Sequence, residues 1–476
     1  MPTTPITPIT PQNSQQDLVG LSHKSIVNQL LAVKESVVKR APDYNMHGLV
    51  DQNKLAWFFK QVGHLGNRHY PYQSYVQPSV NNGIFRMEAG AAGPTTVALL
   101  ADWASSTPES TLIGGLAAGQ DYSIHLGDTY YIGNSKEISD NFNDTVGGPW
   151  PYGTKGSFAM LGNHEMYSSG KPFFTELLPY MGIMGGGKEP QRQEASFFCL
   201  ENDHWRIIAL DTGYDALKGL LGLTPNTGLK IQPQEMDWLT NIVRPGNDKR
   251  GIILLSHHQC YSAFEPYEFQ AILPQIAPLF ANRNMLWFWG HEHRLAFYGY
   301  NSLAAGGGAA VAGGTAAGGG TVGGGTAATG GAAAGGGTMG GAGAGFFARC
   351  IGHGGMPVEL GAFKTKNANA TDPANRNLVM YDDRPRATID SNIALGHNGY
   401  VILELNGPGL AVKYYDESFV DAQGARSPIV EERWSVDTAT GMMKGEAIED
   451  HANLTHFQSK IQLAISRDGE AVMTRP

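Results

Sequence analysis

The chain has 476 residues, 42% of them hydrophobic, so it is long enough to bury a large core in one main domain. Its formal net charge of -9 argues against broad binding to nucleic acids, which usually requires a basic surface. The three cysteines, Cys199, Cys260 and Cys350, show no CxxC spacing, which argues against a disulfide framework or a zinc ribbon.

The N-terminal part of the chain is predicted to lie outside the main domain. Residues 1–20 are rich in Thr, Pro and Gln, which is typical of a disordered tail, and residues 21–93 contain apolar residues at helical spacing, which predict a helical appendage. The N-terminus lacks the basic start and apolar core of a secretory signal, and no run of about 18 large apolar residues occurs. We therefore expect a cytoplasmic protein that binds no membrane.

Residues 94–416 have the pattern of an α/β domain. Short apolar and β-branched runs recur, as expected of strands buried on both faces, and helices are predicted between some of them, at residues 233–243 and 268–281. Strands that alternate with helices predict a layered α/β fold. The predicted strands are residues 95–101, 122–126, 158–161, 205–210, 251–255 and 285–289.

Residues 304–345 interrupt this domain with a segment made almost wholly of Gly, Ala and Thr. Such a segment cannot bury enough apolar area to offset its ordering entropy, so it is predicted to be a flexible insertion, with a mobile lid as the alternative. Beyond it, residues 398–416 predict a β-hairpin around an Asn-Gly-Pro-Gly turn, and residues 417–476 predict a β-rich extension.

Five polar clusters follow predicted strands and contain side chains that bind metals. Each cluster alone is also compatible with an ordinary turn or a buried polar residue. Together they offer carboxylate, amide and imidazole donors at strand ends, where ligands gather in α/β sheets, and so they predict a two-metal hydrolytic site. The clusters are ALLADWASS (Asp102), HLGDTYY (Asp128 and Tyr131), MLGNHE (Asn163 and His164), LLSHHQ (His257 and His258) and FWGHEHR (His291 and His293).

The order of these motifs resembles the calcineurin-like metallophosphoesterase family over residues 95–300. Most members have Asp-x-His in the first motif, and this chain has Ala104 in place of that His. Trp103, together with Tyr131 three residues after Asp128, is similar to the purple acid phosphatase branch, although that branch has Gly at the position of Ala104. The resemblance implies a four-layer αββα sandwich that hydrolyses phosphoesters, with small phosphomonoesters the favoured substrates.

The resemblance also implies the roles of the site residues. A tyrosinate ligand suits Fe(III) at one position, with Fe(II), Zn(II) or Mn(II) at the other, although a buried aromatic is the alternative reading of Tyr131. A metal-bound hydroxide would attack the phosphorus, and His164 would stabilise the transition state or protonate the leaving group. The first metal would be held by Asp102, Asp128, Tyr131 and His293, and the second by Asp128, Asn163, His257 and His291. The expected substrate contacts are Asn163, His164 and His258. His353, in the glycine-rich segment IGHGGMP, is expected to line the substrate pocket, with an ordinary turn residue as the alternative.

Three further residues are interpreted from their places in the motifs. Glu165 and Glu292 lie inside metal motifs and are expected to orient ligands, and Asp211 is expected to cap the turn after its strand. Two other functions stay open, a phosphodiesterase of the same family and a non-catalytic binding protein on the same fold. The sequence indicates no particular protein partner.

Overall fold

The computed structural model describes residues 69–75, 81–90, 93–143, 150–183, 190–218, 224–265, 267–303, 344–360, 378–390 and 393–456. The predicted disordered tail, the helical stretches expected before residue 69 and all but the last two residues of the predicted insertion lie outside these residues.

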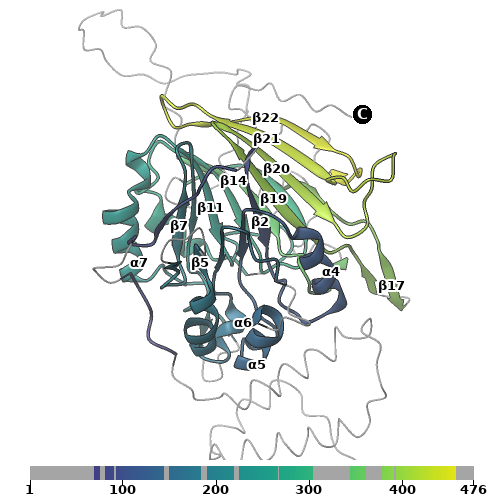
Figure 1. Ribbon diagram of the computed structural model, residues 1–476, viewed down its shortest axis with the longest axis horizontal. Coiled ribbons are helices and arrows are strands. Elements are labelled where there is room, and N and C mark those ends of the chain that lie inside the picture. Colours follow the sequence, from purple (N-terminus) through teal and green to yellow (C-terminus); the bar gives the residue numbers. More distant parts are fainter. Residues whose placement is uncertain are drawn as a thin grey trace, which may run out of the picture.

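Two nine-stranded sheets form most of the described chain (Figure 1). In spatial order, the first sheet contains β1 (Ile84–Arg86), β7 (Phe198–Glu201), β8 (Trp205–Ala209), β11 (Gly251–Ser256), β12 (Asn284–Trp289), β14 (Gly345–Ile351), β13 (Leu295–Ser302), β16 (Leu378–Tyr381) and β23 (Thr455–His456). Strands β8, β11, β12 and β14 run parallel, and β13, β16 and β23 continue the sheet in antiparallel pairing.

The second sheet has a parallel half and an antiparallel half. In spatial order it contains β22 (Met443–Asp450), β21 (Val430–Val436), β20 (Gly409–Asp416), β19 (Gly399–Asn406), β2 (Thr95–Leu100), β3 (Tyr122–His125), β4 (Gly156–Ala159), β5 (Gly182–Ile183) and β6 (Gln191–Arg192). Strands β2, β3 and β4 are parallel, whereas β19 to β22 form an antiparallel meander.

The remaining elements are short. Two small sheets pair β9 (Leu217–Lys218) with β10 (Thr224–Pro225), and β18 (Ile393–Leu395) with both β15 (Glu359–Leu360) and β17 (Ala387–Asp390). The α-helices are α4 (Pro108–Ala117), α5 (Ser135–Ile138), α6 (Asn163–Met166), α7 (Pro233–Trp238) and α8 (Leu273–Ile276). Single turns of π-helix span Ser139–Asn143, Phe173–Leu177 and Leu239–Val243, and 3₁₀ turns span Leu178–Tyr180, Pro245–Asn247 and Gln270–Ile272. None of the described helices has the length and apolar character needed to cross a membrane.

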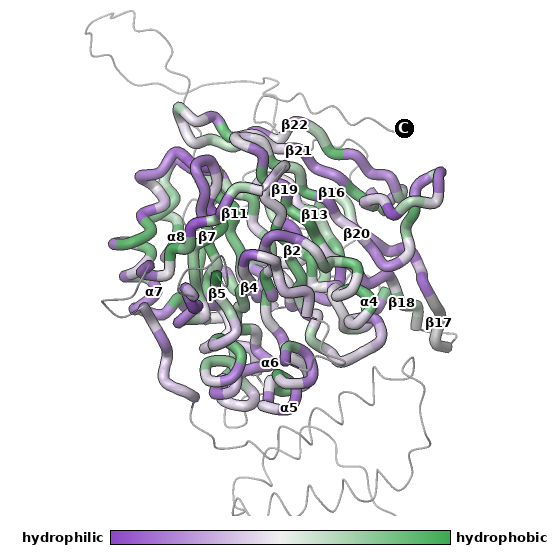
Figure 2. Tube along the Cα trace, viewed as in Figure 1, coloured by the Kyte–Doolittle hydropathy of each residue, from purple (hydrophilic) through white to green (hydrophobic). Residues whose placement is uncertain are grey.

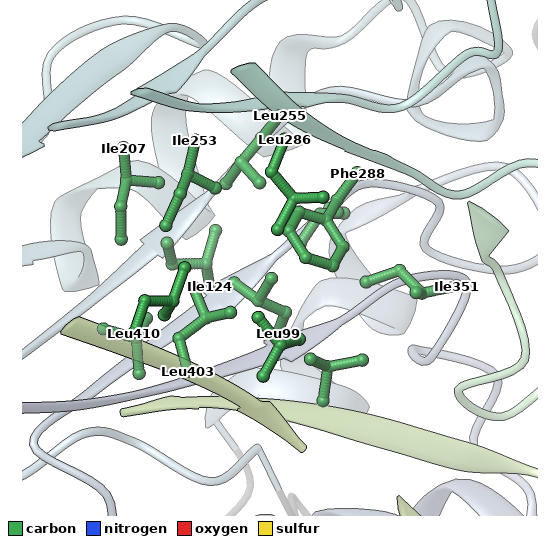
Figure 3. Packing of buried hydrophobic residues seen from close by; sticks show 14 of the residues in the cluster. Leu99, Ile124, Ile207, Ile253, Leu255, Leu286, Phe288, Ile351, Leu403 and Leu410 are labelled. Carbon is green, nitrogen blue, oxygen red and sulfur yellow. The ribbon is translucent and has the colours of Figure 1, made fainter. Parts of the chain in front are cut away.

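The main core lies between the two sheets. Side chains alternate across a strand, so Ile253 and Leu255 of β11 point between the sheets, while Ile252 and Leu254 face outward. Figure 3 shows Leu99 of β2 and Leu403 of β19 in the same cluster as residues of the first sheet. The hydrophobic colour in Figure 2 accordingly follows the strands at the centre of the molecule.

Helices cover both outer faces. Trp238 of α7 and Ile276 of α8 pack on the first sheet, and Ile113 of α4 and Ile138 of α5 pack on the second. Burial of both sheet faces explains why the central strands are apolar throughout. The predicted four-layer αββα sandwich is confirmed.

The strand predictions agree closely with the structure. All six predicted strands are present within two residues of their predicted bounds, and β19 and β20 form the predicted hairpin, closed by pairing of Asn406 with Gly409. The helix predicted at residues 268–281 is shorter, because α8 ends at Ile276, two residues before Pro278, whose nitrogen cannot donate a helical hydrogen bond. Strands β1, β21 and β22 lie outside residues 94–416, yet they extend the two sheets.

Candidate metal centre

Both sheets bring the carboxyl ends of parallel strands to one place. Asp102 follows β2, Asp128 follows β3, and Asn163 follows β4 in the second sheet. From the first sheet, His257 follows β11, and the turn containing His291 and His293 follows β12. These six residues are called the metal-donor cluster below.

Three members of the cluster have an uncommon backbone conformation. The φ angles are +54° at Asp102, +72° at Asp128 and +65° at His291, in the left-handed region that favours glycine. A side chain in this region costs on the order of 1 kcal/mol. Such a conformation turns each side chain sharply at the strand end, and its occurrence at three positions of one cluster is typical of a functional site.

Two glycines before the donors are required by close packing. A Cβ at Gly162 would overlap Oδ1 of Asp128, and a Cβ at Gly290 would overlap Oδ2 of Asp102. These glycines therefore allow the backbone to approach the two carboxylates, a use of glycine beyond simple turn formation.

The two carboxylates of the cluster are buried and share one hydroxyl partner. Asp102 and Asp128 are 0% and 1% exposed. The Tyr130 hydroxyl lies 2.7 Å from Asp102 Oδ1, 3.0 Å from Asp128 Oδ2 and 2.9 Å from His293 Nε2. Burial and the charges of the two carboxylates raise the pKa of Tyr130 well above its ordinary value, so in the absence of a cation the phenol keeps its proton.

Tyr131, the tyrosine predicted as a ligand, makes other contacts than Tyr130. Its half-buried ring packs edge-on to Tyr130, with ring centroids 6.2 Å apart, and burial and the charge of Glu137 raise its pKa to about 12. Its backbone carbonyl lies 2.6 Å from His164 Nδ1. The structure thus turns the neighbouring Tyr130 toward the cluster, which the sequence interpretation missed because two adjacent tyrosines carry no signal of which one faces inward.

The nitrogen donors lie on the side of the first sheet. His257 Nδ1 is 2.9 Å from the carbonyl of Leu126, which turns Nε2 toward Asp128 Oδ1 at 3.3 Å. Burial alone lowers the pKa of His257, but the charge of Asp128 outweighs it and raises the pKa to about 9. The His291 backbone N–H donates to Asp102 Oδ2 at 2.8 Å, linking the two sheets at the cluster.

His258 lies beside His257 and His291, and it is held by Thr212, a contact that the sequence interpretation missed. The Thr212 hydroxyl accepts a hydrogen bond from the His258 backbone N–H at 2.9 Å and lies 3.3 Å from its Nδ1. Donor atoms of His257, His258 and His291 lie within 4.8 Å of one another, as do those of Asp102, Asp128 and His257. Thr212 directly follows the predicted Asp211 cap, and this place just after a strand is the sequence signal for the contact.

His164 sits at the open side of the cluster. Its backbone N–H donates to Asp128 Oδ1 at 3.0 Å, and its Nε2 lies 3.7 Å from Asp128 Oδ2. The ring stacks at a tilt on Tyr130, with centroids 4.3 Å apart, and its side chain is 18% exposed. His164, the 31%-exposed His293 and the partly exposed His291 are therefore open to an arriving substrate.

The acidic residues inside the motifs support the loops. Glu165 Oε2 accepts from the backbone N–H groups of Gly162 at 2.9 Å and Asp128 at 3.3 Å, so it joins two of the turns that carry the donors. Glu292 accepts a hydrogen bond from the Ser262 hydroxyl. Asp211 accepts from the N–H groups of Gly213 and Tyr214, at 2.8 and 3.0 Å, which confirms that it caps the turn.

His353, predicted to contact the substrate, is buried in the structure. It is 1% exposed, and its carbonyl accepts hydrogen bonds from Asn398 Nδ2 at 3.0 Å and from the Gly399 N–H at 2.8 Å. Its role in substrate binding stays a prediction.

The donor set fits metal ions. Two buried carboxylates have no Lys or Arg ion pair among the described residues, and metal cations held between them and the imidazoles would offset the cost of their desolvation. Asn163 Oδ1 is buried without a hydrogen-bond partner in the described part of the chain. An unpartnered amide oxygen beside buried carboxylates and imidazoles is the expected state of a metal ligand without its metal.

Comparisons with known proteins agree with this geometry. Residues 97–295 match the family model described as calcineurin-like phosphoesterase, a family that usually binds two metal ions. No curated protein matches the chain. A solved structure, described as GAP50, the anchor in the inner membrane complex of Plasmodium, is 11% identical, with a TM-score of 0.39, over 76% of this chain and 92% of that one. A likeness of that size carries no argument about function.

Proposed function

Residues 97–295 form a calcineurin-like phosphoesterase domain, and on this premise we propose that the protein hydrolyses phosphoesters, phosphomonoesters preferentially, at a dinuclear metal site similar to that of purple acid phosphatases. The observation that carries the proposal is the convergence of Asp102, Asp128 and His257 from two different sheets within 4.8 Å.

Two groups of donors support a pair of positions that share Asp128. Asp102 and His293 lie on the side of Tyr130, with His293 Nε2 3.5 Å from Asp102 Oδ1. His257 Nε2 lies 3.3 Å from the other oxygen of the shared carboxylate, Asp128 Oδ1, and we assign Asn163, whose Oδ1 is buried without a partner among the described residues, to the same group. The oxygen-rich first group suits Fe(III), and the second group suits Fe(II), Zn(II) or Mn(II). Cations held there would supply Lewis acidity for the phosphoryl oxygens and a water of lowered pKa.

The residues of the chain then position the substrate and move a proton. His164 Nδ1 donates to the Tyr131 carbonyl in the tautomer that this 2.6 Å contact favours, so Nε2 is directed toward the open side of the cluster. When protonated, Nε2 can donate to a phosphoryl oxygen or to the leaving-group oxygen. The hydrogen bond from the His164 N–H to Asp128 couples the placement of this ring to the shared carboxylate.

The test measures metal content and turnover together. The full chain, loaded with iron, zinc or manganese, is expected to bind two metal ions and to hydrolyse p-nitrophenyl phosphate faster than bis(p-nitrophenyl) phosphate. Asp128→Asn should lose bound metal and at least about 10³-fold in turnover, because metal ions contribute several kcal/mol to transition-state stabilisation. Asp203→Asn is the matched control, since that side chain is 76% exposed on the surface.

The other outcomes separate the alternatives. Faster hydrolysis of the diester would identify a phosphodiesterase. Two bound metal ions with no hydrolysis of either ester would favour a non-catalytic binding protein, and the absence of bound metal would refute the proposed site.

A further inference from the structure

We propose that Tyr130 supplies an oxygen ligand to the metal position defined by Asp102 and His293, in place of the imidazole that Ala104 lacks. The inference rests on the proposed metal site and adds to it a donor that differs from the tyrosine predicted by resemblance, Tyr131.

The backbone places Tyr130 next to the missing imidazole. Ala104 and Thr129 form a parallel β-bridge, and the Tyr130 N–H donates to the Ala104 carbonyl at 2.8 Å. The Tyr130 ring therefore starts beside position 104, where the first-motif His of most related sequences would stand. Ala104 is fully buried and has only a methyl side chain, so it leaves that side of the cluster to the phenol.

The distances around the Tyr130 hydroxyl match those between neighbouring ligands of one cation. With metal–ligand bonds of about 2.0–2.1 Å, adjacent ligand atoms of an octahedral ion lie about 2.9 Å apart. The Tyr130 oxygen is 2.7, 2.9 and 3.0 Å from Asp102 Oδ1, His293 Nε2 and Asp128 Oδ2. One phenolic proton cannot serve both carboxylates at once, whereas a cation at their common centre would bind all four atoms.

The contacts shown for Tyr131 differ from those of Tyr130. Burial and the charge of Glu137 in α5 raise the pKa of its phenol, and its backbone carbonyl lies 2.6 Å from His164 Nδ1. The Tyr131 backbone carbonyl holds His164, and substitution of the Tyr131 side chain leaves this contact in place.

Tyr130→Phe and Tyr131→Phe form a matched pair for the test, with Fe(III) as the probe. Phenolate bound to Fe(III) gives a visible charge-transfer band, so both this band and the iron content of the full chain are measured. We expect the band in the wild type and in Tyr131→Phe. Tyr130→Phe should lose the band and bind iron about 10-fold or more weakly, the size of effect seen when metal sites lose a supporting group.

The possible failures are distinguishable. A band that survives in Tyr130→Phe but disappears in Tyr131→Phe would overturn the assignment and leave the proposed function standing. An iron-loaded, colourless wild type that hydrolyses phosphoesters would show that no phenolate binds. A wild type that binds neither iron, zinc nor manganese would refute the proposed function itself. Thermal unfolding of both variants shows whether a loss of iron reflects loss of the fold.

Discussion

The Arg349–Glu432 pair and the metal-donor cluster both bury charge, and the two are built differently. Arg349 of β14 and Glu432 of β21 form a two-pronged ion pair across the sheets, with distances of 2.6 and 2.9 Å. Both Glu432 oxygens also accept further hydrogen bonds, from the Tyr414 hydroxyl at 2.9 Å and from Trp434 Nε1 at 2.8 Å. The metal-donor cluster has two buried carboxylates that contact imidazoles and a phenol, and no Lys or Arg forms an ion pair with them among the described residues.

The comparison indicates that the ion pair contributes to stability and that the metal-donor cluster is arranged to bind a ligand. A buried pair whose hydrogen-bonding capacity is filled holds the sheets together, and nothing is left over for a ligand. At the cluster, the two carboxylates lack a Lys or Arg partner and the Asn163 oxygen lacks a hydrogen bond within the described part of the chain, so the free energy of metal binding would compensate for a site that is unfavourable without metal.

The largest effect is expected on turnover, from a substitution in the metal-donor cluster. Asp102→Asn should lower turnover about 10³-fold, because it removes a charged donor from the first metal position. The metal-free protein should unfold at the same or a higher urea concentration than the metal-free wild type, since an uncompensated buried charge has been removed. Activity assays and urea unfolding in EDTA check both results. A large loss of stability in EDTA would mean that Asp102 is structural.

At the Arg349–Glu432 pair, we expect a loss of stability without a loss of bound metal. Glu432→Gln should lower the free energy of unfolding by about 3–5 kcal/mol, because Arg349 is left as an uncompensated buried charge. Metal bound per folded chain should not change. Glu431→Gln, on the same strand but paired with Arg433 at the surface, is the control and should cost less than about 1 kcal/mol. Equal effects of the two substitutions in urea unfolding would contradict the stabilising role of the pair.

A smaller effect is expected from the residue that orients His258. Thr212→Val keeps the side-chain shape but removes the hydroxyl that contacts His258, and it should lower metal affinity or turnover about 10-fold. Thr240→Val is the control, because the exposed Thr240 hydroxyl only donates to the carbonyl of Met236 in α7. Titration of zinc into both variants is the measurement, and unchanged affinity and turnover in Thr212→Val would exclude the proposed orientation.

The smallest effect concerns pH. Burial raises the pKa of Asp211 to about 6, whereas an aspartate in the unfolded chain titrates near about 3.9. Between these values the folded state binds more protons, so the free energy of unfolding falls as the pH rises. Asp211→Asn should make this slope less negative by up to about 1.4 kcal/mol per pH unit. Urea unfolding at pH 4, 5 and 6 measures it, and an unchanged slope would show that another group is responsible.

Much of the fold was readable from the sequence because it depends on local patterns. Continuous apolar runs such as residues 251–255 mark strands covered on both faces, and the Asn406–Gly409 turn marks a hairpin. The membership of β1 in the first sheet was not readable, because pairing with a strand distant in the sequence leaves no local signal.

The sequence by itself determined which kinds of donor follow which strands, and hence that carboxylate, amide and imidazole groups would meet at the carboxyl ends. Only the tertiary structure decided which of two adjacent residues faces the cluster. Tyr130 is selected over Tyr131 by pairing beside Ala104, and the ring of His257 is oriented by the carbonyl of Leu126 in the other half of the sandwich. Neighbouring side chains point in different directions, so contacts with distant backbone atoms settle which one faces the cluster.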